Sequence, residues 1–172
     1  LPSDELPMVD RMFRARANRH LFVADARSAR LLLVTNRAIA GRADQSFLSK
    51  FVKSEMPKIR HKVEVNFEDK ILLLGYDLKL PHGDYVGAGE SFELTMYWKA
   101  LRSVPGNFRI FVHIDATELR IHGDHDPVDG KYPVRLWNAG DIIVDHQKLD
   151  VPPNYNTGPY TIFVGFYSGE TR

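Results

Sequence analysis

The amino-acid sequence predicts a mostly β protein, an antiparallel β-sandwich of the jelly-roll type preceded by a small α/β lead-in. Three observations predict this fold. Apolar and polar residues alternate with a period of two in several short runs after residue 62, turns rich in proline and glycine separate these runs, and no helical periodicity lies between them. The long connections are typical of jelly rolls rather than of tight meanders. We therefore assign residues 62–172 to the sandwich and residues 1–61 to the lead-in, which we expect to pack on it.

The lead-in is expected to contain two helices and one strand. The stretch "PMVDRMFRARA" places Met8, Met12 and Ala15 at helical spacing, with arginines opposite them. The stretch "ARLLLVTNR" is typical of a buried strand. A second helix is predicted in "DQSFLSKFVKSEMP", where Asp44 would cap its N-terminus and Pro57 would end it. The apolar face of this second helix would consist of Phe47, Leu48, Phe51 and Val52.

The sandwich strands follow from the alternating runs. In "HKVEVNF", the apolar Val63, Val65 and Phe67 alternate with polar residues, which predicts a strand with one buried face. Five further runs have the same character or are rich in β-branched and aromatic residues: "KILLLGYDL", "SFELTMYWKA", "FRIFVHIDA", "GDIIVDHQKLDV" and "YTIFVGFYS".

Composition and charge exclude several functions. The chain has no cysteine, which excludes disulfides, thiolate catalysis and zinc sites that use sulfur. No run of 18 apolar residues is present, so we expect no membrane span. The net charge of +1 hides a basic N-terminal part, because residues 1–62 carry 13 Lys and Arg against 6 Asp and Glu. The arginines lack a recognition-helix pattern, so we expect no nucleic-acid partner, and a solvated face or a surface near anionic lipid fits them better.

The stretch "HGDHDPVDG", residues 122–130, concentrates histidine and aspartate. His122, Asp124 and His125 are residue types that bind zinc, manganese or iron. However, Gly123 and Pro127 prevent the helix on which common zinc motifs depend, and the spacing is not that of a calcium-binding EF-hand. We therefore expect a structural loop and no cofactor, and keep a ligand-binding loop and a metal site as alternatives.

Two further residues could belong to the alternative metal site. His113 and Asp115, in "FVHID", are two residues apart and so share one face of a strand, where they would form a cluster with His122 or His125. The simpler interpretation is a half-buried histidine that bonds to a neighbouring loop. No nucleophile elbow and no glycine-rich phosphate loop are found, so we expect no catalysis by the isolated chain.

Loop aromatics suggest a different kind of site. Aromatic rings stack on the apolar faces of sugars, while amide groups bond to sugar hydroxyls. Two loops have this composition, and together they form the predicted glycan-binding site: Trp137, Asn138, Asn154, Tyr155 and Asn156. The alternative is that these rings fill the core.

The order of motifs in the sandwich carries a resemblance to a known family. "VNFEDKILLLGYDL", "YWKALRSVPGNFRIFVHID", "HGDHDPV", "YPVRLWNAGDIIVD" and "GPYTIFVGFYSGETR" follow one another from residue 65 onward. This order resembles the soluble C-terminal β-sandwich of bacterial multi-pass membrane glycosyltransferases, a group related to the dolichyl-phosphate-mannose–protein mannosyltransferases and the lipid A aminoarabinose transferases. The lead-in looks like the segment that joins the last membrane helix of those enzymes to the sandwich.

The resemblance implies a non-catalytic accessory domain on the periplasmic or extracytoplasmic side of a bacterial membrane. In those glycosyltransferases the catalytic acids lie in loops between membrane helices. This chain lacks such helices, so no catalytic residue is assigned to it. The implied partners are a glycan or a glycosylation acceptor, and the membrane through the parent chain. The resemblance also implies that Asp124, Trp137 and Asp145 bridge loop and strand by hydrogen bonds. Two rivals remain: a free-standing metal-dependent enzyme that uses His113, His122 and His125, and a purely structural protein–protein module.

Overall fold

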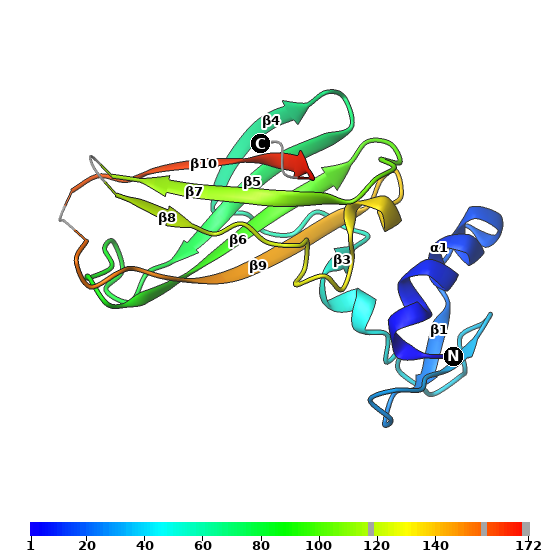
Figure 1. Ribbon diagram of the computed structural model, residues 1–172. Helices are drawn as coiled ribbons and strands as arrows, with labels where there is room; N and C mark the ends of the chain where they lie inside the picture. The colour runs from blue at the N-terminus through cyan, green and yellow to red at the C-terminus, as the bar shows by residue number, and fades with distance from the viewer. Residues whose placement is uncertain (117–118, 156–157, 170–172) are drawn as a thin grey trace.

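The computed structural model describes residues 1–116, 119–155 and 158–169, and these residues form mostly β-structure. Two antiparallel sheets pack face to face, which confirms the predicted sandwich fold (Figure 1). The larger sheet has the order β3-β9-β6-β5-β4, and its strands are β3 (Val52–Lys53), β4 (His61–Phe67), β5 (Ile71–Lys79), β6 (Ser91–Ala100) and β9 (Ile142–Asp150). The smaller sheet has the order β10-β7-β8, and its strands are β7 (Phe108–Asp115), β8 (Arg120–His122) and β10 (Thr161–Ser168).

The core lies between the two sheets, where alternate residues of the central strands face each other. Strand β6 buries Phe92, Leu94, Met96 and Trp98, as its period-two pattern predicts. Strand β7 buries Ile110, Val112 and Ile114 from the opposite side. The Trp98 ring meets the Phe166 ring of β10 edge-on, with 4.9 Å between the ring centroids, which closes the core between the layers.

Strand β4 departs from its predicted pattern. The alternation predicts a buried face, but Val63 and Val65 are 37% and 44% exposed. The strand is the edge of the larger sheet, and the three-stranded sheet is too narrow to cover it. Only Phe67, at the end of β4, reaches the core, where its ring contacts the rings of Trp98 and Phe166.

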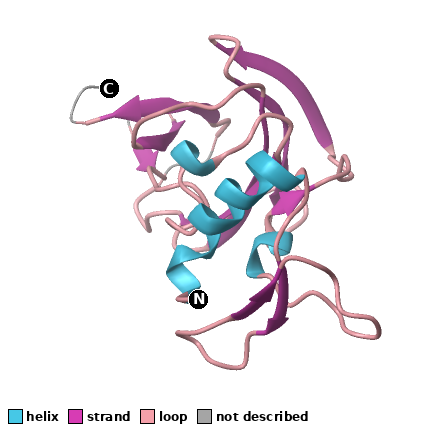
Figure 2. Ribbon diagram, turned by 90° about the vertical axis from the view of Figure 1, so that its right-hand side faces the viewer, coloured by secondary structure: helices cyan, strands magenta, loops and turns pink. Residues whose placement is uncertain are grey.

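The lead-in contains the first predicted helix, α1 (Leu6–Ala17), after a short 3-10 turn, η1 (Ser3–Glu5). Strands β1 (Phe22–Asp25) and β2 (Leu33–Thr35) form a separate two-stranded sheet. Figure 2 shows α1 in front of the sandwich strands and above this small sheet. Among the described residues, no helix is both long and apolar enough to cross a membrane.

The prediction of a second helix is wrong. Only one 3-10 turn, η2 (Phe47–Lys50), forms there, and Ser46 rather than Asp44 caps it by accepting a hydrogen bond from the Leu48 amide. The chain then extends, because β3 pairs with Ile142 and Ile143 at the edge of the larger sheet. The ladder and the burial of Val52 outweigh the local helical pattern.

Arginines of α1 attach the lead-in to the sandwich. The Arg14 guanidinium donates to the carboxylate of Asp141, with 2.7 Å between Nη2 and Oδ1, and the Asp141 side chain is 2% exposed. Arg11 donates to Ser103 and to the carbonyl of Arg135. Part of the basic surplus of the lead-in therefore pairs with acceptors of the sandwich.

Candidate metal centre

The stretch 122–130 continues strand β8 as an extended segment along the edge of the smaller sheet. The Gly123 amide donates to the carbonyl of Val112 over 2.7 Å, and His125 and Ile110 exchange two backbone hydrogen bonds. Gly123 permits this path, because a Cβ there would lie 2.9 Å from the Leu149 side chain. Alternate side chains of the segment therefore face outward and inward, as in a strand.

The inward histidine joins the two sheets. His125 Nε2 lies 2.7 Å from Oδ2 of Asp145, a fully buried residue of β9 in the larger sheet. The second Asp145 oxygen accepts from the Val128 amide over 2.8 Å. Asp145 therefore bridges loop and strand, as the resemblance implies, and Asp124 does the same by accepting from the Val112 amide over 3.2 Å. The Trp137 indole instead donates to the carbonyl of Tyr132, inside its own loop.

Both ring nitrogens of His125 face oxygen acceptors. Nε2 meets the Asp145 carboxylate, and Nδ1 lies 2.8 Å from the carbonyl oxygen of Gly123. This arrangement suits the doubly protonated imidazolium, which donates from both nitrogens. Burial lowers the pKa of His125, but the hydrogen bond to Asp145 and its negative charge outweigh this effect, so the pKa is raised above the usual value.

We predict that this ion pair makes stability depend on pH. Because the folded-state pKa of His125 is raised, its contribution is fully present below the unfolded value of about 6.5 and is lost as the pH rises through the folded-state value. Urea unfolding of the wild type and of His125→Gln over this range measures it. The difference in free energy of unfolding between the two proteins should shrink as the pH rises. A difference that stays constant or grows would contradict the prediction.

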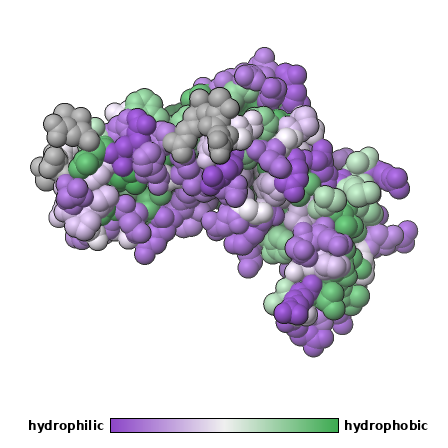
Figure 3. Space-filling view, in the orientation of Figure 1, coloured by the Kyte–Doolittle hydropathy of each residue, from purple (hydrophilic) through white to green (hydrophobic). Residues whose placement is uncertain are grey.

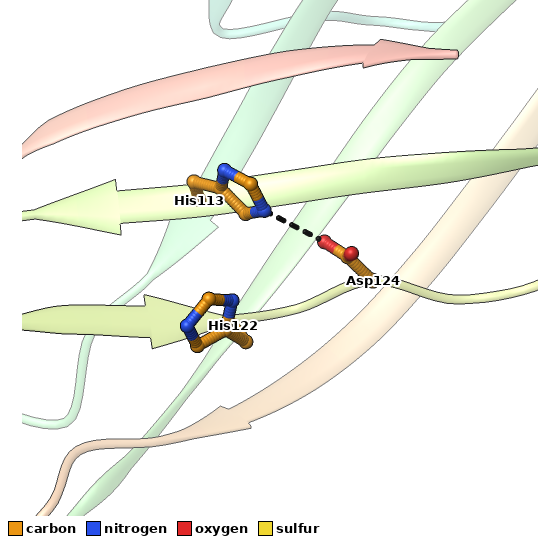
Figure 4. Close-up of side chains that lie close together, drawn as sticks. All are labelled: His113, His122 and Asp124. Atoms are coloured by element: carbon orange, nitrogen blue, oxygen red, sulfur yellow. Dashed lines mark ion pairs between the residues drawn. The ribbon is translucent and has the colours of Figure 1, made fainter. Parts of the chain in front are cut away.

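The outward residues form a compact cluster on the solvent side of the smaller sheet (Figure 4). His113 of β7 and His122 of β8 are direct partners in the antiparallel register, with 5.1 Å between their ring centroids. Asp124 follows His122 by two residues on the same face, and its Oδ1 lies 3.2 Å from Nε2 of His113. One potential ligand atom from each of the three residues lies within 4.8 Å of the other two.

The geometry of this cluster suits a transition-metal ion. Ligands of a tetrahedral zinc ion lie about 2.1 Å from the metal and so roughly 3.4 Å from one another. The 3.2 Å between His113 Nε2 and Asp124 Oδ1 is close to this value, and both side chains are nearly buried, at 12% and 10% exposed. The His122 ring is exposed, and one of its potential ligand atoms lies within 4.8 Å of those of His113 and Asp124. The backbone hydrogen bond from Val112 holds the carboxylate in place, as partners of ligating groups do in metal sites.

Two of the five metal-ligand candidates lie outside this cluster. Asp115 pairs side-on with Arg120, its register partner, through two contacts of 2.6 Å. The hydrogen bond from Arg120 lowers the pKa of Asp115, which keeps it charged and engaged. His125 is turned into the sandwich toward Asp145. The structure therefore does not bring His125 together with His113 and His122, because His122 and His125 face opposite sides of the chain.

The predicted glycan loops do not form one aromatic platform. Trp137 is 1% exposed and Tyr155 is 8% exposed, so neither ring is free for stacking on a sugar. The two loops also lie at opposite ends of the sandwich, because one precedes and the other follows the nine-residue strand β9 (Figure 1). The backbone amide of Asn138 donates to the Asp141 carboxylate, Asn154 is exposed, and Asn156 lies outside the described residues.

One exposed aromatic beside the cluster was missed by the sequence analysis. Phe163 of β10 is the register partner of His113 and is 49% exposed. Phe111 lies on the same outer face of β7, where its ring covers Gly165 of β10. The alternation in "YTIFVGFYS" contains the signal, since Phe163 falls on the face opposite the buried one.

Comparisons with protein-family models, with curated proteins and with solved structures found no match to this chain.

Proposed function

We propose that the protein binds a divalent transition-metal ion through His113, His122 and Asp124. The observation that carries this proposal is the convergence of two imidazoles and one carboxylate, from two paired strands and the segment that follows, within 4.8 Å. Imidazole nitrogens favour zinc, copper, iron or nickel over magnesium and calcium, which prefer oxygen ligands. We infer zinc as the first ion to test.

The site would leave part of the coordination sphere open. Three protein ligands are one fewer than a structural zinc ion uses, so water or an exogenous ligand would complete the sphere. His113 and Asp124 are nearly buried, so such a ligand would approach from the side of the exposed His122 ring. Phe163 would offer this ligand an apolar contact next to His113.

We predict that single substitutions abolish tight zinc binding. His113→Ala, His122→Ala and Asp124→Asn each remove one ligand, and each should weaken binding by more than about 100-fold, beyond the 10–100-fold typical of losing a second-sphere partner. Isothermal titration of metal-free protein with zinc measures this. Asp124→Asn is the sharpest variant, since its amide oxygen retains the acceptor for the Val112 amide while the charge is lost.

His82→Ala is the matched control, because His82 is also a surface histidine beside a carboxylate, that of Glu90, but lies outside the cluster. This variant should bind zinc as the wild type does. Absence of zinc binding by the wild type, or equal binding by all variants, would contradict the proposed function.

A second candidate is the accessory domain that the resemblance implies. We propose it as an extracytoplasmic domain of a membrane glycosyltransferase that contacts a glycan or acceptor and is not catalytic alone. It is supported by the way the resembling motifs interlock: "HGDHDPV" and "GDIIVD" meet through His125 and Asp145, and the "YPVRLWNAGD" stretch closes on itself through Tyr132 and Asp141. The motif residues thus contact one another within the sandwich.

The reading frame that encodes this chain tests the second candidate. Several membrane-spanning helices in the same frame, with acidic loop residues between them, are the expected finding. A frame without any such helix would contradict it, and the metal-binding proposal would stand independently.

A further inference from the structure

Helix α1 exposes an apolar and basic face to solvent. Met8 and Met12 lie one turn apart and are 50% and 64% exposed. Arg16 continues the same face along the next turn and is exposed. The exposed Arg19 lies just past the end of the helix, where its guanidinium is 6.0 Å from the centroid of the Phe13 ring. This is the reverse of an ordinary surface helix, whose large apolar side chains point toward the core.

The opposite face of α1 is fixed to the protein, so the methionines have no route inward. Leu6 is fully buried, and Asp10 accepts hydrogen bonds from the Leu21 amide and lies 2.7 Å from His20. Arg14 completes this face through its buried pair with Asp141. The orientation of the exposed face is therefore determined by at least three independent contacts.

The basic end of this face is broader than the helix. Arg19 and His20 line a shallow hollow of about 250 Å³ together with Arg37, which is also exposed. The acidic Asp44 lines the same hollow, but its Oδ1 accepts hydrogen bonds from the amides of Val23 and Ser46. Figure 3 shows hydrophobic and hydrophilic side chains intermixed on the surface of the lead-in.

We propose that this face of α1, made of Met8, Met12 and Arg16, docks the protein on a membrane surface rich in anionic phospholipid, together with Arg19 and Arg37 beside the end of the helix. The two thioether side chains would enter the boundary between headgroups and acyl chains, and the guanidinium groups would contact lipid phosphates. The methionines distinguish this surface from a nucleic-acid site, which uses basic and polar groups. The arginines distinguish it from a purely apolar protein contact.

Co-sedimentation of the full chain with lipid vesicles tests the proposal. The protein should bind vesicles that contain a quarter phosphatidylglycerol and should bind pure phosphatidylcholine vesicles at least about tenfold more weakly. Arg16→Glu with Arg19→Glu should reduce binding to the anionic vesicles by at least about 25-fold, since each basic residue near such a surface contributes about fivefold. Met8→Ser with Met12→Ser should also weaken binding, because less apolar surface enters the lipid.

Lys58→Glu with Lys62→Glu is the matched control, since both lysines are exposed but lie just before and in strand β4 and not on α1. This pair should bind nearly as the wild type does, and far-UV circular dichroism should show that every variant is folded. Failure of the wild type to bind anionic vesicles would overturn the proposal, as would equal loss in the control pair. Binding of a short DNA duplex in place of the vesicles would also overturn it and assign the arginines to nucleic acid.

Discussion

Replacing Trp137 with alanine is expected to lower the free energy of unfolding by about 3–5 kcal/mol, the range for a large aromatic side chain in a core. The Trp137 side chain is almost completely buried, and its ring lies edge-on to Phe166 with 6.2 Å between the centroids. The substitution would also leave the carbonyl of Tyr132 without the indole donor. Urea unfolding followed by circular dichroism measures the change.

Tyr85→Ala is the control for this experiment, because Tyr85 is 59% exposed. It should change the free energy of unfolding by less than about 0.5 kcal/mol. A Trp137→Ala protein within about 1 kcal/mol of the wild type would contradict the buried position and would reopen a ligand-binding role for this ring.

Asp145→Ala is expected to have an effect of similar size, about 3–5 kcal/mol, through a different mechanism. It would leave the His125 imidazolium without its counter-charge, and the Val128 amide without an acceptor. Asp145→Asn retains one oxygen acceptor and should therefore destabilise less than Asp145→Ala. The same unfolding measurement compares the two variants.

Asp150→Ala is the matched control, since Asp150 belongs to the same strand, β9, but is exposed and bonds only to Ser91 among the contacts described. It should be close to neutral. If Asp145→Ala were as stable as this control, the buried pair would not hold the segment 122–130 in place.

The sandwich was predictable wherever a strand is covered on one face. The alternation in β6 and β7 assigns the inward residues correctly, because both strands lie under the opposite sheet. The same alternation fails for β4, since a period of two does not show whether a second layer covers the strand. The helix prediction that includes residues 47–53 fails for a related reason. The pairing of Val52 and Lys53 with Ile143 and Ile142 involves residues far apart in the sequence.

The candidate site was predictable only in part. Spacing shows that His113 and Asp115 share a face of the predicted strand. It does not show that residues 122–124 run on like a strand, and it does not give the register that places His113 opposite His122. It also leaves open which histidine of the segment faces inward, a choice made by the buried Asp145 some 20 residues later.

For the aromatic loops, the sequence analysis predicted a binding site that the structure does not form. Proline, asparagine and aromatic residues in loops are equally typical of exposed sites and of plugs at the open ends of a sandwich. Trp137 and Tyr155 are buried, so they act as plugs at the ends of the sandwich. Their separation could have been foreseen, because a nine-residue strand spans roughly 25–30 Å and places the two loops too far apart for one shallow site.

The position of a bound zinc ion tests the central claim most directly. Crystals of the full chain grown with stoichiometric zinc, and measured on both sides of the zinc absorption edge, would locate the ion by its anomalous scattering. We predict one strong peak about 2.1 Å from a ring nitrogen of His113, a ring nitrogen of His122 and a carboxylate oxygen of Asp124. A peak only at another histidine, such as His82 beside Glu90, or no peak at all, would contradict the assignment of this cluster as a metal centre.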